Sequence, residues 1–500
     1  MNQLKAGAAR ADITPPVGFV EMWGYGSRRL ENTYARGVLD PLWAKALVLE
    51  AGNQVVALAT VDVGAIDPRF TAEVRNEVTR LTGIPSPSIM VLATHNHAAP
   101  TLADNSTNLG AVDAVYREDA KRKIAGAVYM AWQKREPALL GSGRGAVPTY
   151  IAPETVAKRE GAPFSWGYEA RRDDAILANK VFRGEPFFPL SDRSKHTNYG
   201  KTPVDPEAAV IRVDHANGRP LAVLLNFGCH PDVLGPNNVL LSADFPGYAT
   251  NAIERNLGGD ALAMYVQGAG GDIRMVLTFS RELWTQVEDD LDSPMYRDLA
   301  RIGGVLAHET LKTWTTIETR AALPLQAFTE SLLLPWWDPP SAEQLVAYIA
   351  EQEMALAEAE AGRGQTGYGG SPIYDIKTAR ARLNWGRDML DGLKSGLVDP
   401  RGLTIELQVL NLGRQATLLG VPGEVFASTS LKLKEALPDR VVFLCSQANG
   451  LYGYLLPAGA HEEGGYWLER SPQFYTALSA TAPEGEAATR QALVRMAASR

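Results

Sequence analysis

Residues 88–100 read Ser-Ile-Met-Val-Leu-Ala-Thr-His-Asn-His-Ala-Ala-Pro, and this is the most informative part of the sequence. Its apolar first half predicts a buried β-strand over 88–94, since a short apolar run bounded by polar residues is typical of a sheet interior. His95 and His97 follow where that strand ends. On an extended segment, residues two apart point to the same side, so the two imidazoles would converge on a metal, or on a metal and its substrate. A pair of hydrogen-bonded structural histidines is the alternative that this motif alone leaves open.

The segments around this motif predict a parallel pair of strands. β-rich runs lie at 43–50 and 54–63, and apolar residues at helical spacing follow at 68–81 and stop at Gly83. A strand, a helix and a strand in this order favour parallel pairing through a right-handed crossover. Functional sites in such sheets gather at the carboxyl ends of the strands, where Asp62 and His95 would lie.

The rest of the chain continues the alternation of strands and helices. Further strands are predicted at 208–213, 220–227, 261–266, 403–411 and 415–419, and further helices at 113–135, 245–257 and 282–314. The stretch 145–205 is irregular, and we expect it to run over the surface. The chain is therefore predicted to be a single α/β catalytic domain over 1–500, with mixed β-sheets flanked by helices.

Residues 336–395 predict a helical hairpin inserted within this domain. Ser341 and Gln344 form a capping-box pattern at the start of the first helix, which would run to about Glu360. A glycine-rich turn at 362–370 then leads to a second helix around 377–393. The hairpin could serve as an interaction arm or as a helical cap beside the active site.

Composition excludes several classes of protein. The chain has 500 residues, 45% hydrophobic and 21% charged, with a formal net charge of −8 and no basic block, which argues against nucleic-acid binding. No apolar run is long enough to span a membrane, and the first residues resemble no secretory signal. Cys229 and Cys445 are the only cysteines, which fits a reducing compartment. We therefore expect a cytoplasmic protein, and a homo-oligomer stays open.

A second motif, Asn226-Phe-Gly-Cys-His-Pro231, also ends an apolar strand. His230 would be a second candidate ligand, or a satisfied structural side chain. Cys229 should point away from it, as a buried structural thiol. Asp244 follows in a polar turn that opens a helix, where it could simply be the N-cap.

Three more motifs lie where later strands end. The loop Gln267-Gly-Ala-Gly-Gly-Asp272 lacks the Gly-Lys-Ser/Thr of a phosphate-binding loop, so its glycines would allow a ligand to approach or make a tight turn. Glu424, after Val421-Pro-Gly, could be a ligand or an acidic residue favoured by a helix dipole. The tyrosines of Asn449-Gly-Leu-Tyr-Gly-Tyr454 could be functional or packing residues.

Taken together, the motifs resemble the neutral/alkaline non-lysosomal ceramidase superfamily. Residues 94–100 are similar to that family's THTHSGP, and Phe227–Pro231, Pro422–Glu424 and Asn449–Tyr454 follow in the family's order. Gly7–Pro15, Met22–Gly26 and Gly37–Ala46 resemble its N-terminal segments, so the resemblance covers nearly all of 5–475.

The resemblance implies a zinc site and assigns roles by position. The implied Zn²⁺ ligands are His95, His230, Glu424 and Tyr454, a set of nitrogen and oxygen donors suited to zinc. His97 would be the histidine that polarises the scissile group or shuttles a proton, with Tyr454, Arg159 and Arg274 as further catalytic residues. The carboxylates expected to orient the histidines are Asp62, Asp244 and Asp272.

The departures from the family concern the substrate. The family carries Gly-Asp-Val-Ser-Pro-Asn where this chain has Gly271-Asp-Ile-Arg-Met275, so Arg274 replaces a serine and favours an anionic or strongly polar substrate. From the length of 500 residues we also expect no C-terminal immunoglobulin-like domain of the kind that secreted ceramidases carry. We expect a zinc-dependent hydrolase that cleaves an N-acyl bond of a small-molecule substrate. The same site acting on an ester, lactone or glycosidic bond is one alternative, and a non-catalytic binding protein is another.

Overall fold

The structure is a computed structural model that describes residues 3–25, 33–104, 109–147, 149–150, 177–179, 203–236, 238–275, 294–363, 372–464 and 466–499. Most of the irregular stretch expected at 145–205 lies outside the described residues, as does the first part of the helix expected at 282–314.

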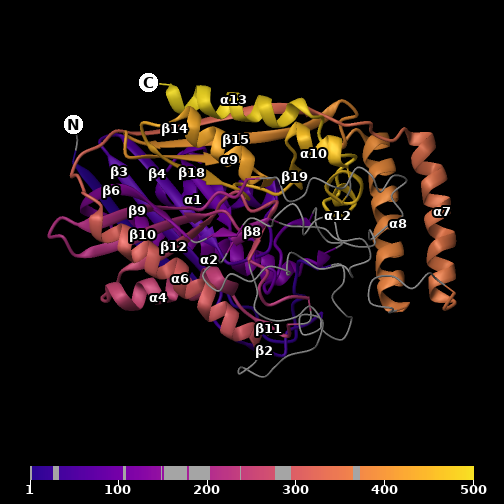
Figure 1. The fold of residues 1–500 in the computed structure, drawn as a ribbon, viewed down its shortest axis with the longest axis horizontal. Coiled ribbons are helices and arrows are strands. Elements are labelled where there is room, and N and C mark those ends of the chain that lie inside the picture. Colours follow the sequence, from indigo (N-terminus) through magenta and orange to yellow (C-terminus); the bar gives the residue numbers. More distant parts are fainter. Residues whose placement is uncertain are drawn as a thin grey trace.

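Eight strands of the described residues form one mixed sheet (Figure 1). Across the sheet they are β12 (Leu262–Gln267), β10 (Pro220–Phe227), β9 (Glu207–His215), β6 (Glu136–Ala146), β1 (Leu4–Asp12), β3 (Trp43–Ala51), β4 (Gln54–Val61) and β5 (Ile89–Ala93). Neighbours are antiparallel except at the two edges, where β10 pairs with β12 and β4 with β5 in parallel. The predicted parallel pair before His95 is therefore confirmed.

A second mixed sheet is built from the C-terminal part of the chain. Among the described residues its strands are, in order, β14 (Leu325–Pro335), β15 (Gly402–Leu412), β16 (Ala416–Gly420) and β18 (Val441–Cys445). Only β16 and β18 are parallel in this sheet. The strands predicted at 403–411 and 415–419 are confirmed.

A helix joins the two strands of each parallel pair in these two sheets, as is usual for parallel connections. α1 (Pro68–Thr82) joins β4 to β5, α4 (Asp244–Leu257) joins β10 to β12, and α9 (Ala427–Ala436) joins β16 to β18. The start of α1 is set by Asp67, whose side chain accepts a hydrogen bond from the Phe70 backbone N at 2.7 Å. It ends at Gly83, which has the left-handed φ of 76° that glycine adopts without strain.

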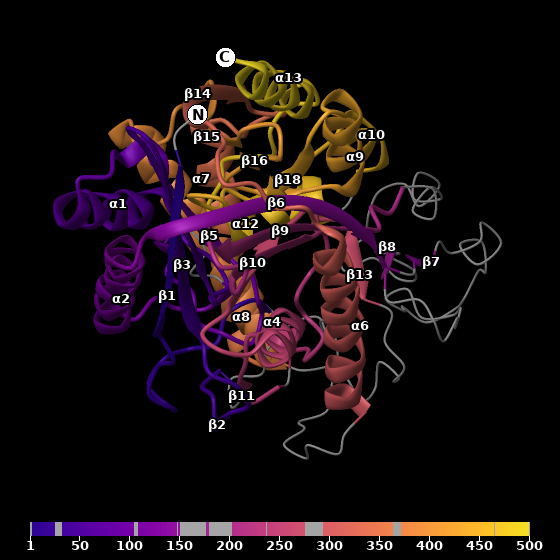
Figure 2. The ribbon, with the colours of Figure 1, turned by 90° about the vertical axis from the view of Figure 1, so that its left-hand side faces the viewer.

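The two sheets pack face to face, and helices cover their outer faces. α1 and α2 (Ala114–Gln133) cover β3 to β5, α4 and α6 (Pro294–Thr316) cover β9, β10 and β12, and α9 and α13 (Glu484–Ala498) cover the second sheet. Figure 2 shows these three groups of helices on three sides of the molecule. Met90 and Leu92 of β5 face the second sheet, whereas Ile89 and Val91 face α1 and α2, which explains the continuous apolar run.

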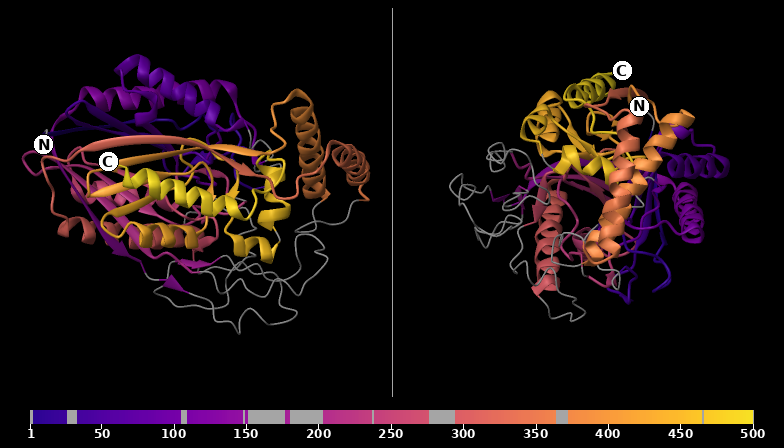
Figure 3. Two further views of the ribbon diagram at one scale, coloured as in Figure 1. Left: turned by 90° about the horizontal axis from the view of Figure 1, so that it is seen from above. Right: turned by 90° about the vertical axis from the view of Figure 1, so that its right-hand side faces the viewer.

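The inserted hairpin is confirmed as α7 (Ala342–Glu360) and α8 (Pro372–Ser395). The capping box forms, with Ser341 Oγ accepting from Gln344 N at 3.2 Å and Gln344 Oε1 accepting from Ser341 N at 2.7 Å. The hairpin projects at the end of the molecule away from the two termini (Figures 1 and 3). Its inner end is packed, because Trp385 contacts Leu478 and donates to the Ala477 carbonyl at 2.7 Å.

Shorter elements complete the fold. They are the strand pairs β2 (Gly37–Val38) with β11 (Leu240–Leu241) and β17 (Glu424–Val425) with β19 (Tyr454–Leu455), the three strands β7 (Thr149–Tyr150), β8 (Leu177–Asn179) and β13 (Ile273–Met275), the 3₁₀-helix η2 (Ser86–Ser88), and the helices α10 (Ala458–Glu463), α11 (Tyr466–Glu469) and α12 (Ser471–Phe474). Among the described residues, no helix has both the length and the apolar composition needed to cross a membrane.

Candidate metal centre

The candidate site lies where the carboxyl ends of the parallel strands meet. His95 follows β5, His230 follows β10, and Glu424 follows β16. The loops after β12 and β18 contact the same region, since His230 N donates to Ile273 O at 3.2 Å and Glu424 N donates to Gly453 O at 2.8 Å. Three strand–helix–strand units thus bring residues more than 300 positions apart to one place.

His95 sits just beyond β5 in an unusual backbone conformation. Its φ is 62°, a left-handed value that is uncommon for a residue other than glycine and clusters at functional sites. The side chain is 1% exposed, and its Nδ1 lies 2.9 Å from the Gly64 carbonyl oxygen. A carbonyl only accepts, so Nδ1 carries the proton and Nε2 keeps its lone pair. Nε2 has no hydrogen-bond partner in the part of the chain that the structure describes.

His230 is oriented in the same way. It is 5% exposed, and its Nδ1 lies 3.0 Å from the Gly270 carbonyl oxygen in the loop after β12. Its Nε2 is therefore the nitrogen that could bind a metal. A hydrogen bond from the outer ring nitrogen to a backbone carbonyl is a usual way to fix a metal-binding histidine.

A carboxylate oxygen faces both imidazoles. Oε2 of Glu424, a residue that is 2% exposed, lies 3.6 Å from His95 Nε2 and 3.6 Å from His230 Nε2. Ligands bound at roughly 2.0–2.1 Å to a tetrahedral zinc ion are about 3.3 Å apart, so these distances suit three ligands of one ion. Glu424 lies in β17, and α9 begins only at Ala427, so a helix dipole does not explain an acidic residue here.

His97 completes a group of three buried histidines. One ring nitrogen from each of His95, His97 and His230 lies within 4.8 Å of the others, so these three side chains could hold a metal ion. The ring centroids of His97 and the other two histidines are 5.2 and 5.0 Å apart. The structure thus offers two candidate groups of metal ligands, the three histidines, or His95 and His230 with Glu424. His95 and His230 belong to both groups.

The two histidines of the His-Asn-His motif converge for a reason other than the one predicted. We expected an extended segment, but β5 ends at Ala93 and the chain turns through the left-handed residue His95. The rings of His95 and His97 are nearly perpendicular, at 88°. His97 instead packs between the rings of Trp23 and Tyr25, at centroid distances of 5.1 and 4.9 Å.

Glycine is required at position 24 to make room for the ring of His97. Gly24 has a φ of +112°, and a Cβ there would lie 2.6 Å from the His97 ring. The segment that resembled a family motif at 22–26 thus forms a wall of the site around His97.

Tyr454 lies next to Glu424 in the ladder between β17 and β19, where the two residues are register partners. Its ring packs near Phe426, Trp467 and Tyr475, at centroid distances of 6.4, 6.4 and 6.1 Å. The structure therefore brings four of the expected residues, His95, His97, His230 and Glu424, into one cluster with Tyr454 beside it.

Sequence reasoning missed Tyr475. Its phenol donates a hydrogen bond to Glu424 Oε1. No spacing pattern could have found it, because the contact joins residues 51 positions apart in a loop without a recognisable motif.

The three aspartates expected to orient the histidines do not contact the Nδ1 atoms of His95 or His230, which are bound by backbone carbonyls. They brace the backbone around the site instead. Asp62 accepts from Trp43 N at 2.9 Å, Asp244 from Phe245 N at 2.7 Å, and Asp272 from Ala427 N at 2.8 Å. Each carboxylate accepts a hydrogen bond from a backbone N–H at the start of a strand or helix: Trp43 begins β3, Ala427 begins α9, and Phe245 lies in the first turn of α4.

Burial changes the acidity of two of these carboxyls. Desolvation raises the pKa of Asp62 to about 6 and that of Asp244 to about 7, against hydrogen bonds and, for Asp62, the charge of Lys45. Asp244 has a φ of 53° and accepts from the Val233 and Leu234 N–H groups after His230, while the N-cap of α4 is Ala243. Asp244 thus holds the His230 loop and is not the N-cap.

The glycine-rich loop at 267–272 makes close backbone contacts. A Cβ at Gly270 would lie 2.8 Å from the Cys229 carbonyl carbon, and one at Gly268 would lie 2.8 Å from that of Phe227. Only glycine lets these backbone segments come so close. The close packing brings the Gly270 carbonyl oxygen within hydrogen-bonding distance of His230 Nδ1. Cys229 itself is fully buried in the core under α4 and α6.

The two expected arginines are not placed in the site. Arg159 lies outside the described residues, and Arg274 is described only as a backbone position in β13, paired with Ala178 of β8.

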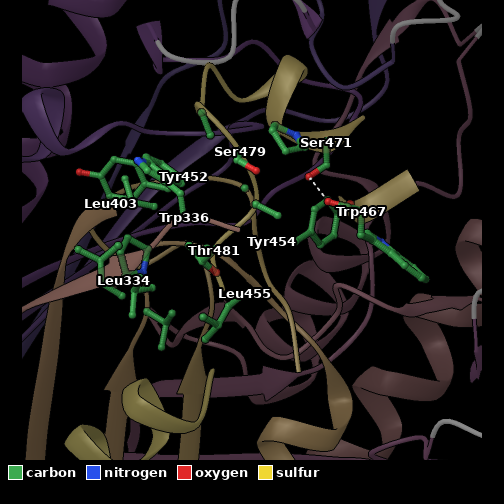
Figure 4. Close-up of a pocket in the computed structure, with 18 residues that line it drawn as sticks. Leu334, Trp336, Leu403, Tyr452, Tyr454, Leu455, Trp467, Ser471, Ser479 and Thr481 are labelled. Atoms are coloured by element: carbon green, nitrogen blue, oxygen red, sulfur yellow. Dashed lines mark hydrogen bonds between the residues drawn. The ribbon is translucent and has the colours of Figure 1, made fainter. Parts of the chain in front are cut away.

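A separate small cavity lies beside Tyr454 (Figure 4). Its volume is about 30 Å³, which holds one or two water molecules but no substrate. It is lined by aromatic and aliphatic side chains, among them Leu334, Trp336, Tyr452, Tyr454 and Trp467, and by none of the three histidines.

The comparisons with known proteins concern the fold. No protein-family model matches the sequence. A crystal structure of neutral ceramidase from Pseudomonas aeruginosa is similar over 99% of this chain and 74% of its own, with a TM-score of 0.67 and 17% identity. A structure of a ceramidase complexed with C2 is similar over 99% and 75%, with a TM-score of 0.66 and 17% identity. The chain therefore has a neutral ceramidase-like fold, as its ordered motifs implied.

Proposed function

We propose that this protein is a zinc-dependent hydrolase that cleaves an N-acyl amide bond of a small polar or anionic substrate. One observation carries the proposal. Two buried imidazoles, each with its Nδ1 bound to a carbonyl, direct Nε2 toward one carboxylate oxygen, at 3.6 Å each. His95 Nε2 is buried and has no hydrogen-bond donor among the described residues. Burying its lone pair in this way would cost free energy unless a cation binds there.

The donors fit zinc in kind. Two neutral imidazoles and a carboxylate are a common set of three ligands in catalytic zinc sites, which keep a further position open. Tyr454, whose β-strand neighbour is Glu424, is our proposed fourth ligand. A bound zinc ion would act as a Lewis acid and would lower the pKa of a bound water to roughly 7, so that this water can attack at neutral pH.

His97 is the proposed proton carrier. It is buried beside both ligand imidazoles and is held by Trp23 and Tyr25. A neutral imidazole there could accept a proton at a ring nitrogen from the water that attacks the amide carbonyl, and release it to the amine nitrogen when the C–N bond breaks. Tyr454, if substrate displaces it from the metal, could instead donate its phenol proton to the developing oxyanion.

The preference for a polar or anionic substrate rests on Arg274, which follows Gly271-Asp-Ile and lies in β13. We propose that its charge attracts an acidic group of the substrate. In an Arg274→Ser variant, KM for an anionic substrate should rise about tenfold or more with kcat less affected, as expected for a lost ion pair to substrate. Unchanged kinetics would remove Arg274 from the site.

A substrate screen of the zinc-loaded protein tests the proposal. N-acyl amino acids, N-acyl amino sugars and sugar lactones separate an amidohydrolase from a hydrolase of other bonds. We expect release of a free amine from one of the N-acyl compounds. Turnover of lactones alone would move the activity to another bond, and a zinc-loaded protein that turns over none of these classes would count against the proposed reaction.

A further inference from the structure

The phenol of Tyr475 donates a hydrogen bond to Oε1 of Glu424 at a buried position. Tyr475 is 4% exposed and Glu424 is 2% exposed, so little water competes for this contact. A hydrogen bond to a charged acceptor is stronger than one between neutral groups, and more so in such surroundings.

The two oxygens of the Glu424 carboxylate therefore have separate tasks. Oε1 accepts from the phenol, while Oε2 is the oxygen that lies 3.6 Å from both His95 Nε2 and His230 Nε2. A carboxylate held in this way presents a single oxygen to the point where the imidazoles converge.

The Tyr475 ring is itself held in place. Its backbone N donates to Ser471 O at 3.2 Å, at the end of α12. The ring packs on Gly453, where a Cβ would lie 3.2 Å from it and where φ is +104°. It also lies edge-on to Tyr454, at 74°. The phenol therefore has a fixed direction toward Glu424.

We propose that Tyr475 is a positioning residue of the metal centre, which orients Glu424 so that Oε2 alone binds the ion. This inference rests on the proposed function only in that the centre holds zinc. It adds to the site a residue that makes no direct contact with the ion.

A Tyr475→Phe variant tests the proposal, because it removes one oxygen and keeps the ring. Tyr116→Phe is the matched control, since Tyr116 is also buried but lies on α2, and its hydroxyl has no hydrogen-bond partner among the described residues. Zinc affinity is measured by competition with a chromophoric chelator. We expect a loss of about 10–100-fold for Tyr475→Phe and a change of less than about twofold for Tyr116→Phe. An affinity of Tyr475→Phe within twofold of the wild type would overturn the proposal.

The absorption spectrum of the Co²⁺-substituted protein gives a second readout. Its ligand-field bands report the geometry around the ion, which a merely structural hydroxyl would not alter. They should shift in Tyr475→Phe and stay in place in Tyr116→Phe. If Tyr475→Phe fails to fold, 3-fluorotyrosine at position 475 keeps the shape and makes the phenol a stronger donor. The bands should then shift with the melting temperature retained, and unchanged bands would overturn the proposal. A wild type that binds no metal would instead refute the proposed function.

Discussion

At the scale of single residues, the site depends on the direction of two ring nitrogens. The Gly64 and Gly270 carbonyls fix the tautomers of His95 and His230, so Nε2 of each is the nitrogen that would bind the proposed zinc ion. Replacing His95 with alanine should abolish zinc binding and activity together. Replacing His97 should abolish activity while zinc remains bound, since we assign it to proton transfer. Metal content of the purified variants and their activity check both outcomes.

His308 offers a matched control for these variants. It is an exposed histidine of α6 whose Nδ1 lies near the Gly304 carbonyl, far from the cluster in sequence and contacts. His308→Ala should retain zinc and activity. If His97→Ala lost zinc and His95→Ala kept it, the assignment of ligands would be reversed.

The ligand candidates could be named at this scale, because His95, His230 and Glu424 lie in short motifs that each follow an apolar strand and whose order resembles that of the ceramidase family. The groups that orient them could not. Gly64, Gly270 and Tyr475 act through a carbonyl or through a contact set by the fold, and neither leaves a pattern in the sequence. Carboxylates were the natural guess for partners of histidine, but the loops here supply carbonyls at hydrogen-bonding distance.

At the scale of elements, Asn449 links the loop after β18 to the strand that leads to His95. Its Oδ1 accepts from Val91 N at 2.9 Å, its backbone N donates to Val91 O at 2.7 Å, and its Nδ2 donates to Gln408 Oε1 at 2.7 Å. Asn449→Ala leaves the buried Val91 N–H without a partner and places alanine at a φ of 61°. We expect the free energy of unfolding to fall by about 2–3 kcal/mol in urea denaturation.

Asn256→Ala is the comparison for Asn449→Ala. Asn256 lies near the exposed end of α4, and among the described residues its side chain bonds the Ala252 carbonyl one turn earlier. Its replacement should change the free energy of unfolding by less than about 0.5 kcal/mol. Equal losses in the two variants would mean that Asn449 does not link the two elements.

The buried carboxyl of Asp62, which directly follows β4, should make the free energy of unfolding depend on pH. The folded pKa of Asp62 is raised by burial from 3.8 to about 6, so the native state keeps a proton that the unfolded chain has lost. The stability that Asp62 contributes is therefore complete below about pH 4 and is lost as pH rises toward and through 6. Relative to Asp62→Asn, the wild type should lose up to about 3 kcal/mol of unfolding free energy over this range. Urea unfolding of both metal-free proteins at pH 4–8 checks this, and parallel pH profiles would contradict it.

Elements formed by local sequence were predicted well. β4, α1 and β5 follow from apolar runs, a helical spacing and Gly83, and the capping box at Ser341 gives the start of α7. Pairing between distant elements was not predictable. The place of β1 between β3 and β6, and the packing of one sheet on the other, are decided by which apolar faces cover each other in the folded chain.

At the scale of the molecule, three strand–helix–strand units direct their carboxyl ends to one centre, and the α7–α8 hairpin lies outside them. The hairpin leaves the second sheet between Pro335 and Gly402, which are paired across β14 and β15. A short turn replacing residues 338–399 should therefore close the two strands. We expect this variant to bind one zinc ion per chain with a lower melting temperature, because Leu478 loses its cover. A folded variant that binds no zinc would give the hairpin a role in the centre itself.

The measurement that bears most directly on the zinc site is an anomalous difference map, recorded at the zinc absorption edge from crystals grown with zinc. We predict one strong peak at roughly 2.0–2.2 Å from His95 Nε2, His230 Nε2 and Glu424 Oε2. No peak in that position, in a folded protein exposed to excess zinc, would contradict the assignment of these three residues as the ligands of a catalytic metal.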